Sequence, residues 1–135
     1  MSQADLIQDY LLRMDIEHDQ IDEHTWVLHD DIGEVDNVVI RSAGPLVIFS
    51  VRVMDIPSDA AERAKLFHEL LHLNGSEMLA GAYGTNGNGV IINEILQGEN
   101  LDFNEFQAAI DGLTLAITEH YPRLKCFHTA SSEEG

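Results

Sequence analysis

The residues of this sequence most able to do chemistry are His68, Glu69 and His72, which form a His-Glu-x-x-His pattern. Two histidines four positions apart lie on one face of a helix and can ligate one zinc ion. The glutamate between them can act as the base that polarises a zinc-bound water. One interpretation is therefore a zinc-dependent hydrolase of the metallopeptidase kind, with His68 and His72 as metal ligands and Glu69 as base.

The element that must position these residues is a helix predicted at residues 59–75. Asp59 is the expected N-cap, and Glu62 three positions later completes a capping-box pattern. Asn74 and Gly75 favour a left-handed stop at the C-terminal end. The motif is therefore predicted to lie in the C-terminal half of one well-delimited helix.

The two faces of this helix decide between a zinc site and a helix surface with no catalytic role. At about 100° per residue, the apolar side chains gather on one broad arc that must face the core; they are Ala64, Leu66, Phe67, Leu70, Leu71 and Leu73. His68 and His72 lie on the opposite arc, where a catalytic zinc would lack an enclosed cavity. A third ligand is also required, and the best-spaced candidate, Glu94, falls in a predicted strand. We therefore favour an exposed or interface-facing surface, and expect no catalytic residue, metal or cofactor.

Composition narrows the class of partner. The chain has 135 residues, 44% of them hydrophobic, which suits one globular domain with a proper core. Its 24 acidic and 7 basic residues give a formal charge of −17. Without a cluster of lysines and arginines, we expect it to bind neither nucleic acid nor an anionic membrane surface. Such a charge suits protein partners with basic or mixed apolar and basic segments, and it is equally explained by a need for solubility alone.

Targeting signals and cysteine content predict a cytoplasmic protein. Residues 1–10 have no basic segment followed by an apolar stretch, so no signal peptide is expected. No apolar run approaches the roughly 20 residues of a membrane span. The single cysteine, Cys126, cannot form an intramolecular disulfide, as expected for a reducing compartment.

Hydrophobic periodicity predicts an α+β fold with the order α-β-β-β-α-β-β-α. A first helix begins after Ser2, and residues 15–24 are expected to form a loop. Strands are predicted at residues 25–29, 36–41, 46–54, 78–83 and 89–96. The last helix is capped by Asp102 and is expected to end at Pro122. We predict a single domain at 1–124, with a twisted antiparallel sheet and helices mainly on one face, and a flexible tail at 125–135.

The third predicted strand has apolar residues on both of its faces. Alternation places Val47, Phe49, Val51 and Val53 on one face. The other face is mixed and includes Leu46, Ile48 and Met54. A sheet covered on one side has no need of these three residues on its outer side. A second helix covering part of that face and scattered surface aliphatics are the alternatives, and we favour contact of the outer face with another chain. Leu46, Ile48 and Met54 are the candidate partner-binding residues.

Several short segments resemble the type III secretion chaperone-like fold, which includes the CesT-type chaperones and the YbjN group. The segments lie at the end of the central helix, around the second hairpin and at both ends of the last helix; they are residues 70–74 (LLHLN), 79–84 (LAGAYG), 89–92 (GVII), 101–106 (LDFNEF) and 121–124 (YPRL). The resemblance covers most of residues 2–124. The AYG strand and the YPRL end are more similar to the YbjN side.

The resemblance implies a small, non-enzymatic, cytoplasmic protein, usually a homodimer. In the secretion chaperones, dimers hold part of a protein client in extended form along a hydrophobic surface, whereas the YbjN group is linked to stress or sensory regulation. Client binding of this kind would combine strand addition to a sheet edge with apolar pockets. The resemblance includes no metal motif at the central helix, so His68 and His72 depart from it.

Overall fold

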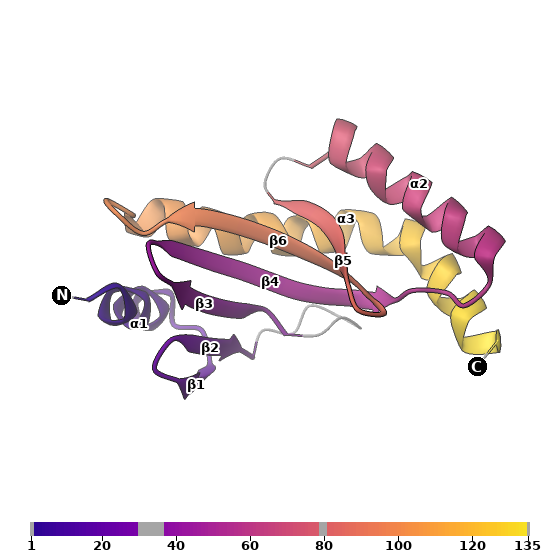
Figure 1. The fold of residues 1–135 in the computed structure, drawn as a ribbon. Helices are drawn as coiled ribbons and strands as arrows, with labels where there is room; N and C mark the ends of the chain where they lie inside the picture. The colour runs from indigo at the N-terminus through magenta and orange to yellow at the C-terminus, as the bar shows by residue number, and fades with distance from the viewer. Residues whose placement is uncertain (1, 30–36, 79–80, 135) are drawn as a thin grey trace.

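The computed structural model describes residues 2–29, 37–78 and 81–134, with side chains up to Phe127. Within these ranges the chain forms three helices around a six-stranded sheet (Figure 1). The strands are β1 (His18–Asp22), β2 (Thr25–Leu28), β3 (Val39–Ala43), β4 (Leu46–Asp55), β5 (Ala82–Asn86) and β6 (Gly89–Gln97). The helices are α1 (Gln3–Met14), α2 (Ala60–Ser76) and α3 (Phe103–Glu134).

All neighbouring strands of the sheet are antiparallel, in the order β1-β2-β3-β4-β6-β5. The predicted α+β class with an antiparallel sheet is therefore confirmed. The order leaves β1 and β5 as the two edge strands. The long central pair β4 and β6 connects the two halves of the molecule (Figure 1).

The sheet has one strand more than the sequence predicts. Residues 15–24 were expected to form a loop, but His18–Asp22 pair with β2 as the edge strand β1. The segment is polar, and four of its five residues are exposed, so it lacks the apolar alternation that signals a half-buried strand. Its backbone pairing, rather than burial of its side chains, makes it a strand.

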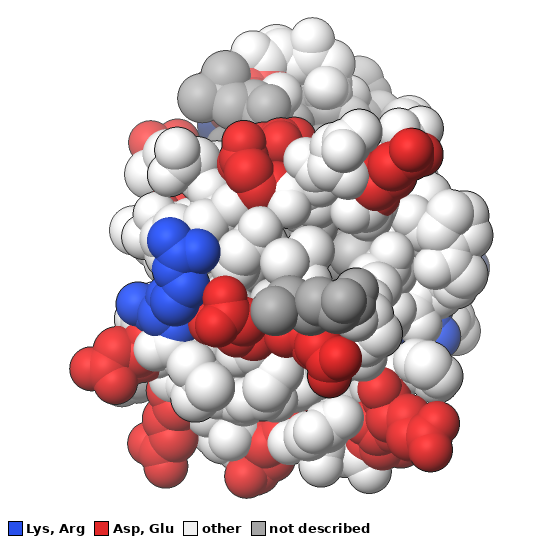
Figure 2. All heavy atoms as spheres, turned by 90° about the vertical axis from the view of Figure 1, so that its left-hand side faces the viewer, with Lys and Arg blue, Asp and Glu red and all other residues white. Residues whose placement is uncertain are grey.

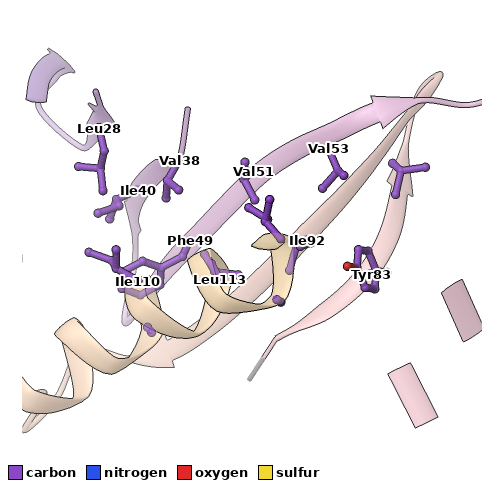
Figure 3. Close-up of a cluster of buried hydrophobic side chains, with 14 of the residues drawn as sticks. Leu28, Val38, Ile40, Phe49, Val51, Val53, Tyr83, Ile92, Ile110 and Leu113 are labelled. Atoms are coloured by element: carbon purple, nitrogen blue, oxygen red, sulfur yellow. The ribbon is translucent and has the colours of Figure 1, made fainter. Parts of the chain in front are cut away.

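The core lies between one face of the sheet and the helices. The rings of Phe49 in β4 and Phe106 in α3 lie 5.3 Å apart, and Tyr10 of α1 lies 5.4 Å from Phe106. Figure 3 shows Ile110 and Leu113 of α3 on the same side of the sheet as Phe49. The predicted inner face of β4 is confirmed, because Val47, Phe49, Val51 and Val53 are all buried.

The predicted N-caps of α1 and α2, Ser2 and Asp59, are present in the structure. At α1, Ser2 Oγ accepts from the backbone N–H of Asp5 at 3.1 Å, and Asp5 accepts from the N–H of Ser2 in return. At α2, Asp59 accepts from the N–H of Glu62 at 2.9 Å. These hydrogen bonds satisfy backbone donors that have no partner within the helix.

The last helix and the second hairpin differ from the predicted boundaries. Helix α3 does not end at Pro122 but continues to Glu134, and buried Ile117, His120 and Leu124 keep its core-facing side continuous across the proline. Strand β5 begins later and ends later than predicted, so a two-residue turn with Gly87 at φ 60° joins it to β6. Residues 36 and 79–80 of the predicted strands lie outside the described residues, and the flexible tail at 125–135 stays a prediction.

Candidate functional site

The His-Glu-x-x-His motif lies on α2 with both histidines exposed. Glu69, the residue predicted as a base, instead accepts a hydrogen bond from Arg123 Nη2 at 2.6 Å. Glu94 lies on β6, paired with Phe49 of β4. Among the described residues, no three histidine, cysteine or acidic side chains lie close enough to hold one metal ion. The hydrolase interpretation therefore has no support in the structure.

Arg123 is the centre of an ionic network that joins α2 to α3. Its Nη1 lies 2.6 Å from Glu77 Oε2, and its Nη2 lies 2.6 Å from Glu69 Oε1, so one guanidinium bridges two carboxylates of α2 and its C-terminal cap. The hydrogen bond to Glu77 raises the pKa of Arg123. The sequence pattern did not predict this network, because its members are 46 and 54 residues apart.

Two buried side chains extend the network into β5. Nε2 of His120 lies 3.7 Å from Glu77 Oε2, and its Nδ1 lies 2.9 Å from the hydroxyl of Tyr83. Burial raises the pKa of the Tyr83 hydroxyl, which therefore stays protonated at physiological pH. These side chains hold the C-terminal end of α2 and the interior of α3 against β5, which indicates a structural role.

The edge strand β5 is closed by a side chain of α2. Asn74 Oδ1 accepts from the backbone N–H of Tyr83 at 2.8 Å, and Asn74 Nδ2 donates to the carbonyl of Tyr83 at 3.1 Å. One amide side chain thus makes the pair of hydrogen bonds that a neighbouring strand would make. A further strand cannot pair with Tyr83 unless Asn74 is displaced.

The other edge strand, β1, is open along the described part of the chain. It pairs with β2 on one side, and Asp19, Gln20, Ile21 and Asp22 are exposed. Its register with β2 shifts between Gln20 and Asp22, and the residue at the shift, Ile21, is 62% exposed. An unpaired strand edge is the feature to which an extended peptide can add as a further strand.

Acidic groups surround this open edge. His29 Nε2 lies 2.6 Å from the Asp19 carboxylate, and the backbone N–H of His24 donates to Asp22 at 2.8 Å. The latter hydrogen bond lowers the pKa of the Asp22 carboxyl. Figure 2 shows acidic side chains spread widely over the end of the molecule that carries α1. A basic segment is therefore better suited to this region than an acidic one.

The outer face of the sheet, opposite the core, carries exposed and half-buried apolar side chains. Leu46 and Ile48 of β4 are half-buried there, and Ile48 pairs with Ile95 of β6, which is 52% exposed. Ile91 lies on the same face as Ile95 by strand alternation. We call Leu46, Ile48, Ile91 and Ile95 the outer-face patch. The core lies on the opposite face, where Phe49 of β4 packs against Phe106 of α3.

Met54 does not belong to this patch, contrary to the sequence-based assignment. The pairing of β4 with β6 shifts register between Arg52 and Met54, so strict alternation fails there. As a result Val53 and Met54 are both buried, at 5% and 3% exposure. Of the three candidate partner-binding residues, the structure leaves Leu46 and Ile48 on the outer face. Their role in binding stays a prediction.

A groove of about 340 Å³ lies between α2 and β5. Phe67, Leu70 and Leu71 of α2 line one side, and Tyr83 and Thr85 of β5 line the other. Leu71 was expected in the core but is 71% exposed. The reason is its position about 140° around the helix from buried Leu66, at the margin of the apolar arc. We call this surface the α2–β5 groove.

Comparison with solved structures shows the fold. A chain of the heterodimeric ExoU–SpcU complex from the type III secretion system of Pseudomonas aeruginosa is 15% identical, with a TM-score of 0.67 over 86% of this chain and 95% of that one. YbjN of E. coli, described as a putative transcription regulator, is 12% identical, with a TM-score of 0.67 over 88% and 91%. A chain of the Yersinia pestis complex of the secretion chaperone SycH with a YscM2 fragment is 11% identical, with a TM-score of 0.61 over 87% and 98%.

Sequence comparison gives the family. No curated protein matches the chain significantly. None of the helices, as far as their residues are described, has the length and apolar character to cross a membrane. The family model CesT_Tir_1 matches residues 1–130, which is nearly the whole chain and includes all six strands. The protein therefore belongs to the CesT_Tir_1 family.

Proposed function

We propose that this chain is a non-enzymatic, chaperone-like or regulatory protein-binding module of the cytoplasm. The observation that carries the proposal is the difference between the sheet edges, since Asn74 closes β5 whereas β1 is open. Family membership supports it, because two of the similar structures are complexes of a chaperone with a protein partner, SycH with a YscM2 fragment and SchA with HopA1. The net charge of −17 makes nucleic acid and anionic membranes poor partners.

The client is an extended segment of a protein or peptide that adds to β1 as a seventh strand. Backbone hydrogen bonds along the edge provide affinity that is independent of sequence. Exposed Ile21 and the carboxylates of Asp19 and Asp22 add selectivity for a segment that mixes apolar and basic residues. The outer-face patch, with Leu46 and Ile48, gives a longer client further apolar contact.

The protein forms a homodimer through the α2–β5 groove. Exposed Leu71 lies beside a groove lined by Phe67 and Thr85, so a protrusion and a hollow occupy the same patch. Two copies related by a two-fold axis could therefore each place Leu71 in the groove of the other. The sheet edge at this end is already closed, so dimerisation here leaves β1 available to a client.

Binding of defined peptides tests the proposed client site. The basic probe peptide is a labelled ten-residue peptide that alternates lysine with isoleucine or threonine, and its control has glutamate in place of each lysine. We expect fluorescence anisotropy to show micromolar binding of the basic probe peptide, weakened by salt, and no binding of the control. Ile21→Lys should weaken binding about tenfold or more, because it replaces an apolar contact with a like charge.

The matched control variant is Leu115→Lys, which places the same charge at a residue of α3 that is 49% exposed. It should bind the basic probe peptide like the wild type. Equal loss of affinity in both variants would reduce the interaction to general charge attraction and contradict the proposal. Sedimentation of Leu71→Asp against wild type tests the dimer, which we expect this variant to dissociate.

A further inference from the structure

A chain of side-chain hydrogen bonds ties β1 to α1 and β2. The indole N–H of Trp26 in β2 donates to Gln8 Oε1 in α1 at 3.0 Å. Gln8 Nε2 lies 3.1 Å from Nε2 of His18, the first residue of β1. His18 Nδ1 lies 2.7 Å from the backbone carbonyl of Ile16. We call these four groups the His18 relay.

The direction of every hydrogen bond in the His18 relay is fixed by its two ends. An indole N–H can only donate, so Gln8 must present its oxygen to Trp26 and its amide nitrogen to His18. His18 Nε2 must then accept, and the ring proton must lie on Nδ1. From there it donates to the carbonyl of Ile16, which can only accept. The relay is complete only with a neutral His18 in this one tautomer.

A second proton on His18 would break the relay. Nε2 would become a donor facing the donor amide of Gln8. If the Gln8 amide turned over to accept from the ring, its NH₂ group would face the indole N–H of Trp26 instead. Trp26 is fully buried, so water cannot replace the lost acceptor. Either arrangement leaves one hydrogen bond unmade between β1 and the elements that hold it.

No charged partner in the relay compensates for a proton on His18. The groups in contact with the ring, the Gln8 amide of α1 and the Ile16 carbonyl, are both neutral. Glu17 and Asp19 flank His18 in the chain, and His29 at the end of β2 already engages the Asp19 carboxylate. His120 differs, because its Nε2 lies 3.7 Å from the carboxylate of Glu77.

We propose that the His18 relay is an acid-sensitive latch on the open edge strand. Protonation of His18 removes the acceptor that Gln8 requires and so releases β1 from Gln8 and Trp26, which means that acidification favours a form in which β1 is detached. The sign follows from proton binding: the detached form accepts a proton that the closed relay has no place for. Release of a client from β1 by acid is a consequence that rests on the proposed function.

Two variants separate the latch from other effects of acid. In His18→Gln, the new amide oxygen can accept from Gln8 and does not titrate. In Gln8→Glu, the carboxylate accepts both from Trp26 and from a protonated His18, so acid completes the relay instead of breaking it. His72→Gln, at an exposed site on α2, is the matched control.

Nuclear magnetic resonance of the full chain tests the latch from pH 7.5 to 5.5. Trp26 is the only tryptophan, so its indole signal is unambiguous. After correction for intrinsic exchange, the protection of β1 amides should fall about fivefold or more on acidification in wild type and in His72→Gln, with a shift of the indole signal. It should stay within about twofold in His18→Gln and rise in Gln8→Glu.

Each result decides the proposal. In the wild type, the ring nitrogen signals report protonation of His18. If His18 gains its proton and neither the indole signal nor the protection of β1 changes, the latch is contradicted, and this result needs no variant. A fall in β1 protection in His18→Gln as large as that in the wild type would also contradict the latch. Binding of the basic probe peptide is measured in parallel. If that peptide fails to bind at pH 7.5 while β1 protection follows the predicted pattern, the proposed function fails and the latch stands.

Discussion

The two edge strands of the sheet, β5 and β1, differ in how their outer backbone groups are covered. At β5, the amide of Asn74 occupies the backbone of Tyr83, and the network of His120, Glu77 and Arg123 holds the surrounding helices in place. At β1, no side chain among the described residues closes the outer backbone in this way, and the strand is held through the His18 relay. One edge is therefore closed by a side chain of its own chain, whereas the other is the edge at which we propose that a partner binds.

Opening the closed edge should have the largest effect on stability. Asn74→Leu leaves the N–H and the carbonyl of buried Tyr83 without partners, which should lower the free energy of unfolding by about 2–4 kcal/mol. It also exposes a second edge for pairing, so we expect concentration-dependent association. Urea unfolding and light scattering measure both effects. Ser76→Ala, which removes one exposed hydrogen bond to the carbonyl of His72, should cost far less.

Removing the buried hydrogen bond behind that edge should have a smaller effect. Tyr83→Phe leaves Nδ1 of buried His120 without its partner, and we expect a loss of about 1–2 kcal/mol in the free energy of unfolding. A double-mutant cycle with His120→Leu isolates the pair. Additive losses from the two changes would show that the contact between Tyr83 and His120 contributes nothing to stability.

The open edge should tolerate change that the closed edge does not. Ile21→Lys alters an exposed side chain on β1, so the free energy of unfolding should stay within about 0.5 kcal/mol of wild type even though affinity for the basic probe peptide falls. Thermal unfolding beside anisotropy measures the two quantities. A large loss of stability would mean that β1 is as firmly built as β5, and the contrast between the edges would be lost.

The smallest effect is expected for the acid dependence at the β1–β2 turn. The hydrogen bond from the His24 backbone lowers the pKa of Asp22 below its ordinary value of 3.8. The stabilisation is therefore fully present above about pH 4 and lost as the pH falls further. The side-chain amide of the Asp22→Asn variant does not titrate, so the difference in free energy of unfolding between wild type and variant should narrow between about pH 4 and 2 in urea unfolding. A difference that stays constant with pH would mean that the pKa of Asp22 is the same in the folded and unfolded chain.

The sequence predicted the parts of the fold that follow from local pattern. The caps at Ser2 and Asp59 and the alternation of Val47 to Val53 depend on residues a few positions apart, and all of them are present in the structure. The α+β class and the antiparallel sheet follow from such signals. The exposed histidines of α2 were also placed correctly, because helix periodicity alone fixes their side.

The errors arose where pairing between distant segments overrides the local pattern. Polar β1 is a strand only because β2 pairs with it, and the register shift beside Met54 turns that side chain inward. Pro122 lies inside α3, where side chains on both sides of it pack into the core. Asn74 hydrogen-bonds to β5, and Arg123 forms an ion pair with Glu69 of α2. No short sequence pattern connects the residues of either contact. The asymmetry of the edges, which carries the proposed function, could therefore be found only in the structure.

The most direct test of the central claim is amide hydrogen exchange in the presence and absence of the basic probe peptide. We expect bound peptide to slow exchange at His18–Asp22 of β1 and to leave Ala82–Asn86 of β5 unchanged. Protection of β5 by bound peptide, or binding with no change at β1, would contradict the claim that β1 is the edge that receives the client.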